Sequence, residues 1–374
     1  MKIRMLAASA AIVALCAGQA MADYAVGALF PLSGTNATYG DIFMSGADMA
    51  AEHLNADGGL KEKVVMRYED SQAMPQPAVV GMTKLVNVDK SPYVLSAFTG
   101  VSKAISTLAT RNKVVAVNGG GVGPDLAELG PYFWNVIPLA NFEIRAIVPY
   151  LTEGGQNKRW ALIYVDDPLG AASKAELEEQ LPLAGAELVD SHAIPTTAQQ
   201  FAGIAAKVRA ENVDVVYIAS YGSQQVQIVK QLRENGVNAQ LASYSGMGVP
   251  DIFALPQADG VVYASQSVNF DAEDPVTRRM VTDYEAKYGK RPSTYTVNYY
   301  NAVRLFGLLA KHLEEKGLAV TGENLLAARN EMGKFDLVGG TVSFEENGTL
   351  LAPIQINQVK DGASVVLKTY DLSE

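Results

Sequence analysis

The stretch LFPLSGTNATYGDIFMSGADMAAEHLNADGGL at residues 29–60 contains the unit from which this chain is built. The first two residues of this stretch, Leu29 and Phe30, end an apolar run at residues 24–30 that is typical of a buried strand. The strand-breaking sequence Pro31-Leu32-Ser33-Gly34 follows it. From residue 41 onward, apolar side chains recur at helical spacing until Gly58 and Gly59 end the pattern. A strand, a turn and a helix in this order predict the first half of a βαβ unit.

The same alternation continues along the chain in two series. The first series predicts strands at residues 64–68, 93–98 and 114–117 and helices at 77–88 and 101–110. The second predicts strands at 160–165, 186–192 and 213–219 and helices at 171–183, 201–210 and 224–235. Residues 132–138, between the series, predict an extended crossover strand. This alternation indicates an α/β fold with right-handed units and parallel sheets, and two series indicate two similar lobes.

The first 22 residues predict an export signal. Lys2 and Arg4 precede an apolar run, residues 5–17, that is too short to cross a bilayer, and Ala20-Met21-Ala22 offers an A-x-A cleavage site. The only cysteine, Cys16, lies inside this run. We therefore expect cleavage after Ala22 and an exported product without a thiol.

Composition excludes several functional classes. With 30 Lys+Arg against 40 Asp+Glu, the formal net charge is −10, and an acidic chain has no electrostatic footprint for nucleic acid. The three histidines stand apart without metal-binding spacing, so we expect no metal and no cofactor. The glycine run at residues 119–123 does not match a nucleotide-binding fingerprint, and it favours a turn where a ligand approaches the backbone.

The stretch at residues 29–60 and the sequence FDLVGGTVSFEENG at residues 335–348 resemble the leucine/isoleucine/valine-binding protein family. The similarity runs in order through essentially the whole chain after residue 22. Members of this family are periplasmic receptors of ABC importers for hydrophobic amino acids and related solutes. The resemblance implies a type I periplasmic binding protein, in which two Rossmann-like lobes are joined by three crossovers. It places the first lobe at residues 23–138 plus 267–334 and the second at 139–266 plus 335–374.

The resemblance also implies a function and a set of partners. We expect a periplasmic, monomeric receptor without enzymatic activity, whose lobes close on one small solute in the cleft between them. Hinge closure of this kind lets an importer distinguish the loaded form from the empty form. The implied partners are the solute and the membrane permease subunits of an ABC transporter, and no nucleic acid.

Three family positions for ligand contact carry other residue types in this chain. A family serine and a family threonine that bind the ligand carboxylate align with Gly100 and Val122. A family acid that pairs with the ligand ammonium aligns with Ser245, and a neutral serine cannot offset a buried positive charge. We therefore expect a hydrophobic or aromatic solute, such as a carboxylate held by backbone N–H groups, rather than a standard α-amino acid.

The remaining candidate positions predict a largely aromatic pocket. Tyr39, Tyr221 and Tyr295 fall on family pocket positions, whereas Leu169 replaces a family tyrosine. Aromatic side chains with a few hydroxyls suit a mostly apolar small-molecule site. The candidate set is completed by Phe98, Ser102, Asn118, Gly120 and Tyr244.

Two alternatives come from other functional classes. A secreted serine hydrolase would use Ser102, because the sequence Gly100-Val101-Ser102-Lys103-Ala104 approximates the G-x-S-x-G elbow, with Asp190 and His192, or His312, as partners. The motif is incomplete, since Ala104 stands in place of its last glycine, and no second feature supports a triad. A binding protein that reports to a membrane receptor is the other alternative, since a fold does not fix a function.

Overall fold

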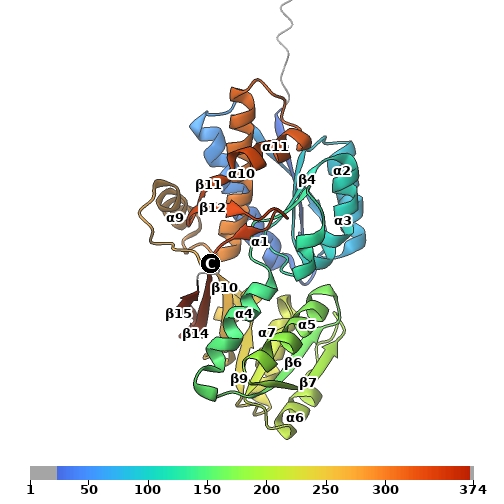
Figure 1. Cartoon of the computed structure of the whole chain (residues 1–374), viewed down its shortest axis with the longest axis vertical. Helices are drawn as coiled ribbons and strands as arrows, with labels where there is room; N and C mark the ends of the chain where they lie inside the picture. The colour runs from blue at the N-terminus through green and yellow to red at the C-terminus, as the bar shows by residue number, and fades with distance from the viewer. Residues whose placement is uncertain (1–22, 371–374) are drawn as a thin grey trace, which may run out of the picture.

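The computed structural model describes residues 23–370, so the export signal predicted at residues 1–22 lies outside the described residues. Two lobes lie one above the other, each built around its own sheet (Figure 1). The main elements of the first lobe are β1 (Tyr24–Phe30), α1 (Ala37–Asp57), β2 (Val64–Asp70), α2 (Pro75–Asn87), β3 (Tyr93–Ser96), α3 (Thr99–Asn112), β4 (Val115–Asn118), β5 (Phe133–Asn135), α9 (Pro275–Tyr288), α10 (Thr294–Glu315) and α11 (Gly322–Met332).

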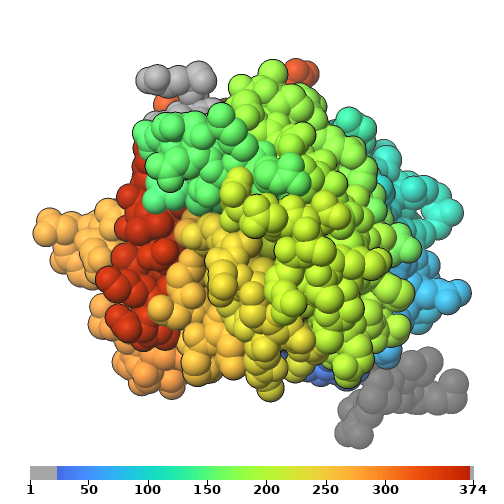
Figure 2. Space-filling view, turned by 90° about the horizontal axis from the view of Figure 1, so that it is seen from below, coloured from blue at the N-terminus to red at the C-terminus, as the bar shows by residue number. Residues whose placement is uncertain are grey.

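The second lobe contains the middle of the chain and its last two described strands. Its main elements are α4 (Ala140–Leu151), β6 (Arg159–Val165), α5 (Pro168–Leu183), β7 (Glu187–Ile194), α6 (Ala202–Ala210), β8 (Val215–Ala219), α7 (Gly222–Glu234), β9 (Gln240–Ser243), α8 (Pro250–Phe253), β10 (Val262–Gln266), β14 (Ile354–Lys360) and β15 (Ala363–Tyr370). Seen from below, the C-terminal strands, in red, lie along one side of this lobe (Figure 2).

The sheets confirm the predicted α/β fold class. The first sheet has the order β2-β1-β3-β4-β5 and is parallel throughout. The second has the order β15-β14-β10-β9-β8-β6-β7, and it is parallel from β10 to β7 and antiparallel only at β14 and β15. Because the parallel strands alternate with helices, the carboxyl ends of the strands in each sheet meet at one edge, where ligands bind in open α/β sheets.

The described residues after 333 form strands in two different sheets. The prediction placed all of residues 335–374 in the second lobe, and only β14 and β15 extend that lobe's sheet. A small antiparallel sheet of β11 (Lys334–Leu337), β12 (Gly340–Phe344) and β13 (Leu350–Leu351) precedes them. It is fastened to α10, where the Asn301 side-chain amide donates to the Val338 carbonyl and accepts from the Val338 N–H.

The glycines of α1 explain how this helix packs closely on α10. A Cβ atom at Gly46 would lie 2.1 Å from the carbonyl oxygen of Thr296, far inside any real contact. A hydrogen at this position therefore lets the two helix backbones touch, and buried aromatic residues such as Phe43 and Tyr299 fill the space beside them. The short spacing of small residues in the stretch at residues 29–60 is thus a packing signal.

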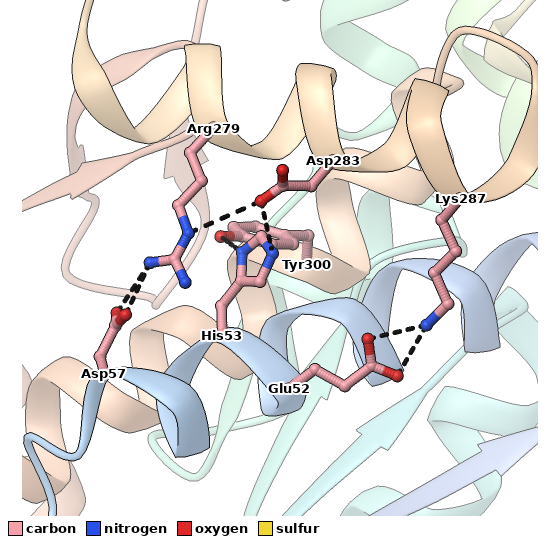
Figure 3. Close-up of polar contacts among 7 residues, drawn as sticks. All are labelled: Glu52, His53, Asp57, Arg279, Asp283, Lys287 and Tyr300. Carbon is pink, nitrogen blue, oxygen red and sulfur yellow. Dashed lines mark hydrogen bonds and ion pairs between the residues drawn. The ribbon is translucent and has the colours of Figure 1, made fainter.

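Seven polar side chains hold α9 against α1 on the outer face of the first lobe: Glu52, His53, Asp57, Arg279, Asp283, Lys287 and Tyr300 (Figure 3). Arg279 pairs with Asp57 at 2.8 Å, and Lys287 pairs with Glu52 at 2.6 Å. His53 lies between these pairs, 2.8 Å from the Tyr300 hydroxyl. Each exposed ion pair adds little to the free energy of unfolding. We therefore interpret this network as fixing the position of α9 on α1 rather than as a main source of stability.

No helix within residues 23–370 combines the length and the apolarity that a membrane crossing requires. Within the same residues, no group of three or more histidine, cysteine or acidic side chains is arranged to hold a metal ion.

Candidate functional site

A cavity of about 350 Å³ lies between the two lobes, at the carboxyl ends of their parallel strands. From the first lobe, residues 35, 36 and 39 line it after β1, residues 72–75 after β2, residues 98–100 after β3, residues 120–122 after β4, and Tyr295 from α10. From the second lobe, residues 167–169 line it after β6, residues 196 and 197 after β7, Tyr221 after β8 and Tyr244 after β9. Its volume suits a small solute.

The first turn of α3 presents backbone donors at this cavity. No side chain caps the helix, so the N–H groups of Thr99 and Gly100, both on the cavity wall, are free to bind an anion. The Thr99 hydroxyl accepts a hydrogen bond from the Gly123 N–H at 3.0 Å and keeps its own proton for a ligand. This arrangement can hold a carboxylate without a basic side chain, and within residues 23–370 no basic side chain lines the cavity.

The backbone before α3 is strained. Phe98 precedes the helix with φ +64°, a conformation that an aromatic residue rarely adopts. Such strain costs on the order of 1–3 kcal/mol and persists where the surroundings impose it, often at functional sites. Here the strained residue, Phe98, has its ring on the cavity wall, next to the free N–H groups of α3.

The predicted aromatic wall is present and crosses the boundary between the lobes. In the first lobe, the ring of Tyr39 lies 5.7 Å from Phe98 and 5.9 Å from Tyr295, in edge-to-face contacts. Phe98 in turn contacts Tyr221 of the second lobe, with 5.3 Å between ring centroids. Tyr244 completes the wall, and its hydroxyl donates to the Ser220 carbonyl. Edge-to-face pairs of this kind stabilise the contact beyond the area that they bury.

Hydrogen bonds also join the lobes around the cavity. The Tyr39 hydroxyl donates to the Gly246 carbonyl at 3.2 Å, and the Tyr295 hydroxyl donates to Ser245 Oγ at 3.4 Å. Each pair takes its donor from the first lobe and its acceptor from the second. The structure is therefore in a closed arrangement, in which the turn at residues 245–247 contacts the first lobe.

Of the residues that the structure describes, Asp167 is the only one with a carboxyl group on the cavity wall. Its Oδ1 accepts from the Gly170 N–H at 3.0 Å and caps α5, while its Oδ2 accepts from the Tyr221 hydroxyl at 2.7 Å. Burial raises the pKa of Asp167 above its ordinary value, and these hydrogen bonds partly offset that shift. Among the described residues, no basic side chain pairs with it.

Nine of the twelve candidate positions line the cavity. They are Tyr39, Phe98, Gly100, Gly120, Val122, Leu169, Tyr221, Tyr244 and Tyr295. The other three lie behind or beside the wall. Ser245 faces a separate groove on the other side of Tyr295. Asn118 is fully buried, and its Oδ1 accepts from the Gly121 N–H at 2.7 Å, so it shapes the glycine loop rather than the cavity surface.

Ser102, the third of these positions, also has no place in a hydrolytic triad. It is fully buried, and its hydroxyl is paired with the hydroxyl of Ser96 at 3.0 Å. His192 lies beside Asp190 and His312 beside Glu331, so neither histidine is hydrogen-bonded to Ser102. A nucleophile needs a base within hydrogen-bond reach, and this geometry does not favour the hydrolase alternative.

Sequence reasoning missed several residues of the wall. Asn36, Thr99, Asp167, Thr196 and Thr197 all line the cavity. Each follows the carboxyl end of a parallel strand, and that position was the signal that could have found them. Asp167 also has a structural role, because it caps α5.

A buried acid behind the wall was missed as well. Glu143 of α4 is fully buried, and its Oε2 accepts from the Ser245 N–H at 3.0 Å. Its Oε1 has no hydrogen-bond partner among the described residues. Burial raises the pKa of Glu143 to about 8. Glu143 thus holds the turn that carries Ser245, although it does not line the cavity itself.

Because Glu143 is a buried acid, we expect the free energy of unfolding to fall as the pH rises. The folded pKa is about 8 and the ordinary value 4.5, so in that window the folded chain keeps a proton that the unfolded chain releases. We expect Glu143→Gln, a neutral mimic, to unfold at a temperature that varies less between about pH 5 and pH 8. At the upper end it should be more stable than wild type by on the order of a few kcal/mol. Thermal unfolding followed by circular dichroism measures the melting temperature of each variant against pH. Glu178→Gln, on the exposed face of α5, is the control. Parallel curves for wild type and Glu143→Gln would contradict this prediction.

Comparison with known proteins gives a consistent picture. A family model described as periplasmic binding protein matches residues 23–363. The Leu/Ile/Val-binding protein BraC3 of Rhizobium johnstonii is 26% identical over 338 residues, covering 88% of this chain and 90% of that protein. The leucine-specific-binding protein of Salmonella typhimurium is 27% identical over 302 residues, covering 79% of this chain and 81% of that protein.

Solved structures share the fold. A leucine binding protein from Thermotoga maritima superimposes with a TM-score of 0.84 at 18% identity, covering 93% of this chain and 99% of that chain. A solute binding protein of an ABC transporter from R. palustris, in complex with benzoate, gives a TM-score of 0.83 at 19% identity and covers 93% and 96% of the two chains. One from Rhodopseudomonas palustris BisB5, in complex with 3,4-dihydroxybenzoic acid, gives 0.83 at 20% identity, with 94% and 98% covered.

Proposed function

Because the chain belongs to the periplasmic binding protein family, we propose that it is the periplasmic solute receptor of an ABC importer and closes its lobes on one small aromatic or hydrophobic carboxylate. The family consists of solute-binding proteins and not of enzymes. The observation that carries the proposal is the closed cavity itself, in which free backbone donors and an aromatic wall face each other between two lobes. The partners in this proposal are the solute and the permease subunits, with the receptor acting as a monomer.

The carboxylate end of the solute is assigned to α3. The helix has 14 residues and no side-chain cap, so its N-terminus carries both free N–H groups and the positive end of the helix dipole. Gly100 allows a close approach there, because nothing crowds its position except Pro75 at 3.8 Å. The family serine is absent at Gly100, but the backbone donor that a carboxylate needs remains.

The body of the solute is assigned to the aromatic wall. Phe98, Tyr39, Tyr221, Tyr244 and Tyr295 surround a space that suits one ring or a short aliphatic chain. The R. palustris and Rhodopseudomonas palustris BisB5 proteins, which share this fold, were solved with benzoate and 3,4-dihydroxybenzoic acid. These complexes support an aromatic acid as the first solute to test.

A standard α-amino acid fits this cavity less well. The position aligned with the family's ammonium-binding acid is Ser245, which lies outside the cavity wall. The nearby acid, Glu143, is buried behind Ser245, where it accepts from the Ser245 N–H, and it does not line the cavity. An ammonium group in that place would lack a charged partner, and such burial costs several kcal/mol.

Equilibrium dialysis of the purified protein against benzoate tests the receptor function. We expect about one benzoate bound per chain and recovered chemically unchanged, because Ser102 has no base beside it. Ser102→Ala should bind as wild type does and should hydrolyse a p-nitrophenyl ester no more slowly than wild type. Ester hydrolysis that disappears in Ser102→Ala would contradict the proposal and restore the hydrolase alternative.

A further inference from the structure

The cavity is electrostatically asymmetric. At the α3 end, the wall offers N–H donors and the Thr99 hydroxyl. At the second-lobe end, after β6 and β8, it offers the Asp167 carboxylate beside Tyr221. A carboxylate repels the carboxylate of a solute and attracts N–H or O–H donors. A solute that carries its acid on α3 in the first lobe can therefore meet an acceptor in the second lobe.

Asp167 has acceptor capacity left for a ligand. A carboxylate can accept about four hydrogen bonds. The side-chain oxygens of Asp167 accept from the Gly170 N–H and the Tyr221 hydroxyl, and the Leu169 N–H also helps to lower the pKa of Asp167, which leaves room for one further donor. Burial raises the pKa of the Asp167 carboxyl group, so each further donor that reaches this group stabilises its ionised form. The hydroxyls of Thr196 and Thr197, which follow β7, lie on the wall of the same lobe.

We propose that Asp167 selects solutes that carry a hydroxyl group on the part remote from the carboxylate, so that the preferred solute is a hydroxylated aromatic acid. This inference rests on the proposed function, because it assumes that a carboxylate is bound at α3. Tyr221 already donates a phenolic O–H to Asp167 at 2.7 Å, so the site accommodates one phenolic donor, and a second would complete it. Asp167 would thus act on specificity while also capping α5.

The expected effect is a preference and not a general gain in affinity. A hydrogen bond to a charged acceptor contributes more to the binding free energy than a hydrogen bond between neutral groups does. Its contribution is enough to change the dissociation constant by about tenfold or more. A methoxy group has no proton to donate, so a methoxylated acid should bind no better than the unsubstituted acid. This contrast separates hydrogen-bond donation from ring size and polarity.

Isothermal titration of the full chain with benzoate, 3- and 4-hydroxybenzoate and 4-methoxybenzoate tests the proposal. For wild type, we expect one of the hydroxybenzoates to bind at least about tenfold more tightly than benzoate and 4-methoxybenzoate. In Asp167→Asn, the amide oxygen is used by the Gly170 N–H, and the NH₂ group faces the solute. The preference should then fall below about threefold.

Two further variants make the test specific. Asp166→Asn changes the adjacent, exposed acid and should keep the full preference. Tyr221→Phe removes the donor that competes for Asp167 and should keep or increase the preference. If wild type binds benzoate and the hydroxybenzoates equally, or if Asp167→Asn keeps the preference, the role of Asp167 is wrong and the proposed function stands. If no aromatic acid binds to wild type, both the solute class and the role of Asp167 are wrong.

Discussion

Gly222→Ala is expected to weaken solute binding by about tenfold, because it disfavours closure of the lobes. Gly222 is the first residue of α7 in the second lobe, with φ +62°. A Cβ atom there would lie 2.1 Å from Asn36 Oδ1, which belongs to the loop before α1 in the first lobe. The clash exists only when the lobes are together, so the substitution disfavours the closed form and leaves the open form accessible. Titration with benzoate or a hydroxybenzoate measures the loss.

Two control variants separate this clash from the backbone cost of alanine at positive φ. Gly185 has φ +71° and open space around it, so Gly185→Ala reports the backbone cost alone and should bind as wild type does. In the double variant Gly222→Ala with Asn36→Gly, the obstructing side chain is gone, and most of the affinity should return. An unchanged affinity in Gly222→Ala would show that Asn36 and Gly222 do not meet in the solute-bound form.

Tyr221→Ala should reduce the affinity for an aromatic acid by roughly 30- to 100-fold while leaving the fold intact. Tyr221 contributes a ring to the wall, a contact with Phe98 across the lobe boundary and a donor to Asp167. Its side chain is only half-buried and does not cap α7, so its removal leaves no large void inside either lobe. Titration combined with thermal unfolding of the unliganded protein distinguishes a loss of binding from a loss of stability.

Tyr288→Ala serves as the matched control for Tyr221. This tyrosine is exposed at the end of α9, away from the cavity, so its removal should leave affinity unchanged. Tyr221→Phe should bind benzoate nearly as wild type does, since it keeps the ring. Should Tyr221→Ala bind as tightly as wild type, the aromatic wall would not contact the solute.

Most of the fold could be predicted from local patterns. The breaker and helical spacing at residues 29–60 correctly predicted β1, the turn and α1, although α1 begins at Ala37 rather than at residue 41. The alternation of strands and helices predicted both parallel sheets because each element carries its own periodicity. The placement of β11 to β13 on α10 could not be predicted this way, because it depends on contacts such as Asn301 with Val338.

The site could be predicted only in part, for a related reason. Aromatic and glycine positions at strand ends were found because the topology brings all such ends together. The roles of Ser102 and Asn118 were not, because tertiary packing decides whether a side chain in the first turn of a helix or at the end of a strand faces the cavity or the interior. Glu143 and Ser245 are far apart in the sequence, as are Asn36 and Gly222, and no local pattern reports such tertiary contacts.

A thermal-shift measurement with aromatic acids and with leucine tests the central claim most directly. A solute at a hundred times its dissociation constant should add roughly 2.7 kcal/mol to the free energy of unfolding, which is readily measured. We predict a clear rise in melting temperature with benzoate or a hydroxybenzoate and none with leucine or valine at the same concentration. A rise with leucine or valine and none with the aromatic acids would contradict the account, because it would show that the cavity selects an α-amino acid, with Asp167 as the partner of its ammonium group.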